Sequence, residues 1–107
     1  MIIVTTGQIK GKKISKTLGL VRGNTIRAKN LGKDIVAGIR NLFGGEIKSY
    51  TSLMTESREE AIGRMVEKAE ELGANAIVGF RFMTSAVMGS AAEILAYGTA
   101  VVVEDAA

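Results

Sequence analysis

The fold is decided by residues 47–72, IKSYTSLMTESREEAIGRMVEKAEEL, which have the pattern of one long amphipathic helix. At about 100° per residue, the apolar side chains fall on one stripe, which comprises Ile47, Tyr50, Met54, Ala61, Met65, Ala69 and Leu72. Six glutamates lie on the opposite side: Glu56, Glu59, Glu60, Glu67, Glu70 and Glu71. Gly73 follows as the expected C-terminal cap, because glycine tolerates the backbone conformation required there. A helix with a single apolar stripe predicts a second layer for it to cover.

That second layer is predicted by the apolar segments that follow the helix. Residues 76–83 and 92–104 read as strands, with a loop over residues 84–90. In the last strand the even positions are Ile94, Ala96, Gly98, Ala100 and Val102, and the odd positions are Glu93, Leu95, Tyr97, Thr99, Val101 and Val103. Both sets are largely apolar or small, whereas a strand with one solvated face would alternate with polar residues. This strand therefore needs cover on both faces.

The N-terminal half predicts further elements. Residues 2–6 are β-branched and read as a strand, residues 7–13 read as a loop, and residues 14–28 read as a hairpin or a bent strand. Gly19 marks a bulge and Gly23-Asn24 marks a turn. A shorter helix begins after the N-cap Asn30, with Leu31, Ile35, Ile39, Leu42 and Phe43 on one face, and ends at Gly44-Gly45.

Composition indicates one α+β domain over residues 1–107 and excludes several kinds of chemistry. The chain has no cysteine and no histidine, so it has no thiolate nucleophile, disulfide or imidazole base. No stretch of about 18 apolar residues predicts a membrane span. The N-terminal apolar run precedes its charges, opposite to a secretory signal, so we expect a cytoplasmic protein without membrane contact.

The charges divide unevenly along the chain. Residues 1–50 hold ten basic side chains against two acidic ones, and residues 51–107 hold four against nine. The basic half lacks the interleaved aromatic residues and docking motifs of nucleic-acid-binding proteins, so no nucleic-acid partner is expected. Opposite charges in the two halves favour head-to-tail contact between copies, and such contacts close into rings. The alternative is an open sheet covered by loops of the same chain.

Two segments, residues 38–82 and 93–103, resemble the YbjQ family of small uncharacterised proteins. The resemblance rests on Gly44-Gly45-Glu46, Tyr50, the run Arg58 to Ala61, Leu72 to Ala76, and Tyr97 to Val101 in combination. It implies a dodecin-like β-α-α-β-β subunit, with a mostly antiparallel sheet packed on one long helix, assembled as a homopentameric ring. It also implies a label of heavy-metal binding. A chain without Cys or His lacks the usual ligands of such a metal, and no cofactor is identified from the residues.

The candidate site residues are polar side chains near the apolar stripe or within the last strand. They form one predicted network at subunit interfaces: Arg40, Glu46, Tyr50, Arg58, Glu93 and Tyr97. Arg58 borders the stripe, so its charge requires an ion pair, with Glu46 and Glu93 as candidates, or a wet edge. Glu46 is either a helix-end carboxylate or a ligand residue. Three glycines allow close approach of a ligand or a neighbouring chain: Gly44, Gly45 and Gly98.

Three classes of function remain open at this stage. The first is a homo-oligomeric module that holds a small ligand or ion between subunits, the second is a structural or adaptor oligomer for other proteins, and the third is an enzyme. The third is disfavoured, because no nucleophile and base occur at a catalytic spacing. The helical methionines read as core rather than as a copper site.

Overall fold

The computed structural model describes residues 1–27, 47–86 and 92–106. In chain order, the elements are the strands β1 (Ile2–Ile3) and β2 (Lys12–Arg27), the helix α2 (Ile47–Glu71), and the strands β3 (Ala76–Ala86) and β4 (Ala92–Asp105). The four strands form one sheet in the order β1-β3-β4-β2. The α+β class, the long helix and a mostly antiparallel sheet are therefore as the sequence predicts.

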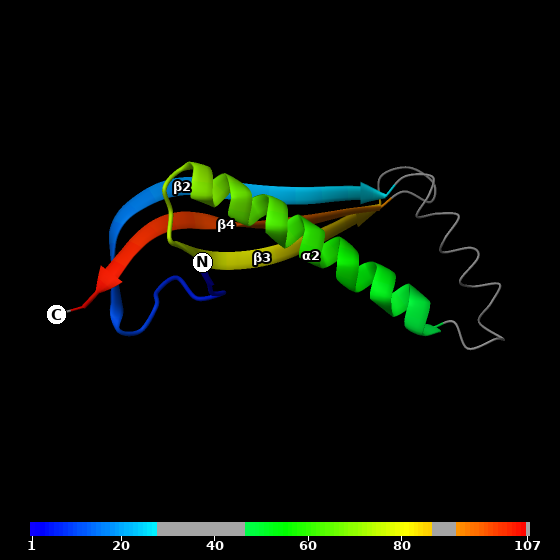
Figure 1. The fold of residues 1–107 in the computed structure, drawn as a ribbon, viewed down its shortest axis with the longest axis horizontal. Coiled ribbons are helices and arrows are strands. Elements are labelled where there is room, and N and C mark those ends of the chain that lie inside the picture. The colour runs from blue at the N-terminus through cyan, green and yellow to red at the C-terminus, as the bar shows by residue number, and fades with distance from the viewer. Residues whose placement is uncertain (28–46, 87–91, 107) are drawn as a thin grey trace.

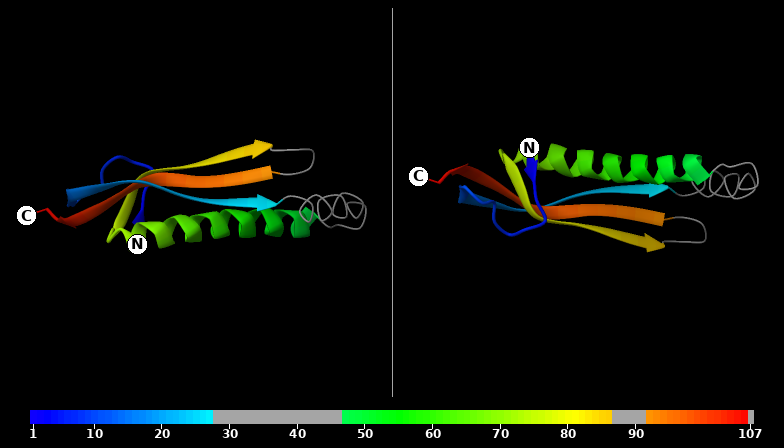
Figure 2. Two further views of the ribbon diagram at one scale, coloured as in Figure 1. Left: turned by 90° about the horizontal axis from the view of Figure 1, so that it is seen from above. Right: turned by 90° about the horizontal axis from the view of Figure 1, so that it is seen from below.

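Helix α2 lies along one face of the sheet, above β2 and β4, and the described elements leave most of the other face uncovered (Figures 1 and 2). Its stripe of Ala61, Met65 and Ala69 is completely buried. Small side chains at two of these three positions let the helix backbone approach the strands closely. Leu72, the last residue of the predicted stripe, lies beyond the end of the helix and is exposed.

The main core forms between this stripe and the inward side of the sheet. Its buried residues come from α2 and from the strands β2, β3 and β4, and they comprise Val21, Ala61, Met65, Ala69, Ile77, Ile94, Ala96 and Ala100. Every second residue of β4 from Ile94 to Ala100 is buried, as expected for the strand face that points toward the helix.

A smaller core lies on the opposite face, at the end of the sheet where β4 finishes. There Val4 and Ile9 of the N-terminal segment pack against Val78, Val101 and Val103. The loop cover that the sequence left open as an alternative thus exists, but in the described residues it protects only this end of the face.

β2 corrects one prediction of the sequence analysis. It is a single strand that pairs antiparallel with β4 along its whole length, so residues 14–28 do not form a hairpin. The predicted turn at Gly23-Asn24 is wrong, because these residues pair in register with Ala96 and Leu95. The predicted bulge at Gly19 is confirmed by a register shift between Thr17 and Gly19 and by a φ of 117° at this glycine. The bent-strand alternative is therefore the correct one.

Several boundaries also differ from the predictions. Lys12 and Lys13 belong to β2 rather than to a loop, and residues 84–86 continue β3. These polar positions are strand because they pair with β4, a tertiary contact that residue type alone does not reveal. β1 is shorter than predicted, although backbone hydrogen bonds from Val4 and to Thr6 continue alongside β3. The helix predicted over residues 31–43 lies outside the described residues.

Candidate functional site

The uncovered side of the sheet is the most unusual surface of the molecule. We call it the open sheet face and define it by side chains of β2, β3 and β4 that point away from α2: Leu20, Arg22, Arg81, Met83, Leu95 and Tyr97. Leu20 is 64% exposed and Met83 is 51% exposed, while Leu95 and Tyr97 are half-buried. The prediction that β4 is apolar on both faces is confirmed, and α2 covers only one of them.

Tyr97 lies at the centre of this face between two arginines. Arg22 of β2 and Arg81 of β3 are the direct partners of Tyr97 on its two neighbouring strands. Directly opposite residues of antiparallel strands share a face of the sheet. Tyr97 therefore has an arginine as its neighbour on each adjoining strand, and two positive charges on one face favour an anionic partner.

Hydrogen bonds fix some of the polar groups at the margins of the face. The Nδ2 of Asn24 donates to the Oε2 of Glu93 at 3.0 Å. Arg81 donates to the backbone oxygens of Thr5 at 2.8 Å and Phe80 at 2.7 Å, which ties β3 to the N-terminal segment. Arg22 is exposed, and no hydrogen bond or ion pair joins it to another described residue.

The predicted polar network is only partly within the described structure. Glu93 and Tyr97 share the outward face of β4. Arg58 lies on α2, across the sheet from both, and it is exposed, so the wet-edge alternative describes it within one chain. Tyr50 lies in α2, but its side chain is outside the described part. Arg40, Gly44, Gly45 and Glu46 also lie outside the described residues.

Gly98 is crowded within its own chain, and the close approach of a ligand or a neighbouring chain at this glycine stays a prediction. A Cβ on Gly98 would lie 2.6 Å from the Cγ2 of Ile77 and 3.1 Å from the carbonyl oxygen of Val78. The residue is buried on the side of β4 that faces the helix. Its small size therefore serves the packing of β3 against β4.

Arg22 and Arg81 are not among the candidate site residues that the sequence predicts. Neither belongs to a recognisable motif, and each stands in a strand of mixed composition. The signal that identifies them is strand register, because pairing with Tyr97 brings together residues from three distant parts of the chain. That register was not available from spacing alone.

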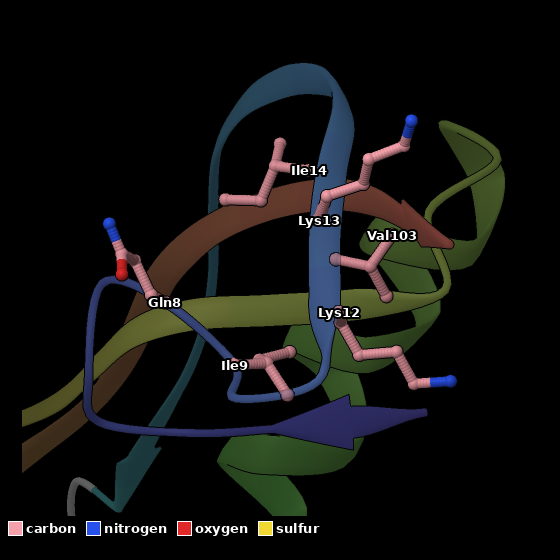
Figure 3. Close-up of a pocket in the computed structure, with 6 residues that line it drawn as sticks. All are labelled: Gln8, Ile9, Lys12, Lys13, Ile14 and Val103. Carbon is pink, nitrogen blue, oxygen red and sulfur yellow. The ribbon is translucent and has the colours of Figure 1, made fainter. Parts of the chain in front are cut away.

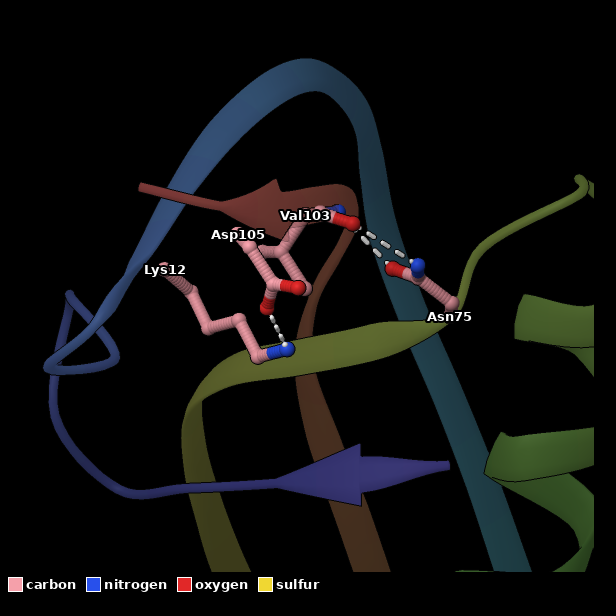
Figure 4. Close-up of polar contacts among 4 residues, drawn as sticks. All are labelled: Lys12, Asn75, Val103 and Asp105. Atoms are coloured by element: carbon pink, nitrogen blue, oxygen red, sulfur yellow. Dashed lines mark hydrogen bonds and ion pairs between the residues drawn. The ribbon is translucent and has the colours of Figure 1, made fainter. Parts of the chain in front are cut away.

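A small cavity of about 320 Å³ lies at the other end of the sheet, beside the N-terminal segment (Figure 3). Ile9, Ile14 and Val103 provide its apolar lining, and Gln8, Lys12 and Lys13 provide the polar lining. The two lysines form ion pairs. Lys12 pairs with Asp105 (Figure 4), and Lys13 pairs with Glu104. The bond from Lys12 lowers the pKa of the Asp105 carboxyl, and the lysine charge adds to that effect.

The α+β fold of this chain is also found among solved structures. A Pediococcus pentosaceus protein of unknown function, from the DUF74 family, superimposes with a TM-score of 0.53 over 97% of this chain and 98% of its own, at 18% identity. At that identity the likeness supports the fold alone.

Sequence relatives identify the family. A family model described as "Putative heavy-metal-binding" matches residues 1–104. A UPF0145 protein of Clostridioides difficile is 63% identical over 98% of this chain and 94% of its own length. A UPF0145 protein of Methanosarcina acetivorans is 62% identical over 94% of this chain and 95% of its own. The chain belongs to the YbjQ family, as the resemblance in the sequence indicated.

The residues of this chain do not fit the heavy-metal description of the family. Soft metals prefer thiolate, thioether and imidazole ligands, and this chain has neither Cys nor His. Met54 and Met65 pack between α2 and the sheet, whereas Met83 lies on the open sheet face, so these thioethers lie on opposite sides of the sheet. Within residues 1–27, 47–86 and 92–106, no three carboxylates cluster in a way that could hold a cation.

In the same ranges, no helix combines the length and apolar character needed to cross a bilayer.

Proposed function

We propose that this protein functions as a homo-oligomeric ring, pentameric as the family resemblance implies, that holds a small ligand at the clefts between its subunits. The observation that carries the proposal is the open sheet face, where large apolar side chains remain exposed next to a half-buried tyrosine and two arginines. Self-association removes such a surface from water at a gain of roughly 25 cal/mol per Å² of apolar area.

The same face supplies groups for a ligand at the subunit boundary. Tyr97 offers a hydroxyl and an aromatic ring, and Arg22 carries a positive charge beside it. This set suits a small anion or an anionic aromatic molecule better than a metal cation, because the face presents donors and positive charge. Subunit interfaces are a common location for such pockets.

Native mass spectrometry of untagged protein tests both parts of the proposal at once. We expect a single closed oligomer, together with any small molecule retained from the cell. A well-folded single chain at micromolar concentration would overturn the proposal.

Thermal denaturation then separates a binding module from an adaptor oligomer. A ligand that binds only the native protein raises the melting temperature, and the rise increases with ligand concentration. We expect inorganic phosphate, benzoate or a mononucleotide to raise it at millimolar concentration, with the Tyr97→Phe and Arg22→Gln variants showing a smaller rise. An oligomer whose melting temperature changes with none of these probes would agree with the proposed assembly and contradict the proposed ligand binding.

A further inference from the structure

The outer side of helix α2 carries a second surface that the single chain does not explain. We call it the acidic ridge and define it by residues at helical spacing opposite the buried stripe: Glu56, Glu59, Gly63, Glu67 and Glu70. All five are exposed. The sequence of α2 holds six glutamates against four basic residues, Lys48, Arg58, Arg64 and Lys68.

The ridge is unfavourable for the helix itself. Like charges three or four residues apart, as at Glu56–Glu59 and Glu67–Glu70, each destabilise a helix by a few tenths of a kcal/mol. Glycine within a helix costs roughly a further 1 kcal/mol relative to alanine. Among the described residues, Arg64 forms an ion pair with Glu60, outside the ridge, and no described ion pair involves a ridge glutamate.

Gly63 lies in the middle of the acidic ridge, and the space above it is open. A Cβ at this position would meet nothing within 4 Å, so no contact within the described chain requires a glycine there. This contrasts with Gly23 and Gly98, which are both crowded by their own chain. A glycine in an exposed helix allows another molecule to approach the backbone closely.

We infer that the acidic ridge of one copy packs on the open sheet face of the next copy, with Gly63 against Tyr97 and the ridge glutamates against Arg22 and Arg81. This inference rests on the proposed oligomer and identifies its two contact surfaces. The charges are complementary, since glutamates meet arginines. The apolar side chains of the sheet face are covered in the same contact.

The dimensions of the two surfaces agree. Arg22 and Arg81 are separated by two strand spacings, which is about 10 Å. A helix with its side chains is also about 10 Å wide. A helix lying along β4 of its neighbour therefore fits between the two arginines and presents glutamates to both. The ridge glutamates then pair with Arg22 and Arg81, so the anionic ligand of the proposed function would compete with them for Arg22 at the edge of this contact.

The two surfaces lie on opposite sides of the sheet (Figure 2). The contact is therefore heterologous, and it leaves each copy with one free surface of each kind until the assembly closes. An isologous dimer would instead bring Arg22 and Arg81 of one copy near the same arginines of its partner, which is electrostatically unfavourable.

Two variants test this inference, and in each of them the charge of one of the two surfaces is reversed. Arg22→Glu alters the sheet face and Glu59→Arg/Glu67→Arg alters the ridge. We expect each variant alone to sediment as a folded single chain. Mixed in equal amounts, they should associate again, because the intact ridge of one variant meets the intact sheet face of the other, and the two reversed surfaces also carry opposite charges. Oligomers that persist in both variants, or variants that dissociate but do not pair when mixed, would overturn the inference.

A matched control separates surface effects from folding effects. Lys16→Glu makes the same charge change as Arg22→Glu on β2 but away from the open sheet face, and it should retain the wild-type oligomer. Should a charge reversal prevent folding, Gly63→Leu provides an independent test. Leucine favours the helix, but its side chain blocks the approach of Tyr97. Gly63→Leu should therefore dissociate the oligomer without loss of helical circular dichroism. An intact oligomer would contradict the contact.

The wild-type protein distinguishes the two proposals. A wild-type single chain contradicts the proposed oligomer and this contact together. A wild-type oligomer that is insensitive to all of these variants contradicts only the contact.

Discussion

Gly23 of β2 lies against the backbone of Ala61 in α2 more closely than any residue with a side chain could. A Cβ on Gly23 would overlap the carbonyl oxygen of Ala61 and the backbone nitrogen of Met65, and it would lie 2.8 Å from the Cβ of Arg64. The obstacle is mainly helix backbone, which cannot turn aside as a flexible side chain can. This contact sets the distance between helix and sheet.

Gly23→Ala should therefore destabilise the protein strongly. Overpacking a close-packed interface costs about 1–3 kcal/mol, and we expect the upper end of that range because backbone atoms are involved. Urea unfolding at one fixed protein concentration measures the change. Gly7→Ala is the matched control, since a Cβ at Gly7 would meet nothing within 4 Å. Equal midpoints for the two variants would contradict the close approach.

At Thr25, in contrast to Gly23, a substitution should stabilise the protein. Its side chain is buried beneath α2, and its Oγ1 has no hydrogen-bond partner within the described chain. An unsatisfied buried hydroxyl costs about 1–3 kcal/mol. Thr25→Val keeps the shape and removes the hydroxyl, so it should raise the free energy of unfolding by about 1 kcal/mol. Thr25→Ser, which keeps the hydroxyl and loses the methyl group, should lower it, and a loss of stability in the valine variant would refute the explanation.

Asn75 closes the turn after α2 by pairing with the backbone of Val103 (Figure 4). Its Nδ2 donates to the Val103 oxygen at 2.9 Å, and its Oδ1 accepts from the Val103 nitrogen at 2.8 Å. The loss of two such bonds in Asn75→Ala should cost about 1–3 kcal/mol in chemical denaturation. Asn24→Ala removes a side-chain bond on the exposed face and should cost less. Similar losses at both positions would argue against a special role for the Asn75 amide.

Asp105 should show a lowered titration that depends on Lys12. The hydrogen bond from Lys12, aided by its charge, lowers the Asp105 pKa below the usual 3.8. Because the folded pKa is the lower one, the stabilisation is present above about pH 4 and is lost as the pH falls through the folded pKa. NMR titration of the carboxyl carbon should show the pKa returning toward its usual value in Lys12→Met. Lys13→Met, which removes the partner of Glu104, should leave the Asp105 titration unchanged, and salt should weaken the Lys12 effect.

The outlines of the fold could be predicted because they follow from local periodicity. The helix over residues 47–71 is encoded by a 3.6-residue repeat of small and apolar side chains, and its end follows from Gly73. The two-faced apolar pattern of β4 also follows directly from alternation along the strand. Each of these signals needs only the residues of the element itself.

The errors arose where the decisive contact is distant in sequence. Gly23-Asn24 has the composition of a turn, but Gly23 is required by helix packing, and Asn24 lies within a strand paired with β4. Likewise, Arg22 and Arg81 became site residues only when strand register placed them beside Tyr97. A glycine required for a turn and one required for close packing are identical in a sequence.

By itself, the sequence determined the family, the α+β class, the long helix, the apolar character of both faces of β4, and the absence of thiolate and imidazole chemistry. These properties depend on residue type and on spacing along the chain. Only the tertiary structure decided which face of β4 the helix covers, which glycines are crowded, and which charges surround Tyr97. Those properties depend on register and on the approach of distant segments, because a side chain acquires its neighbours only when the chain has folded.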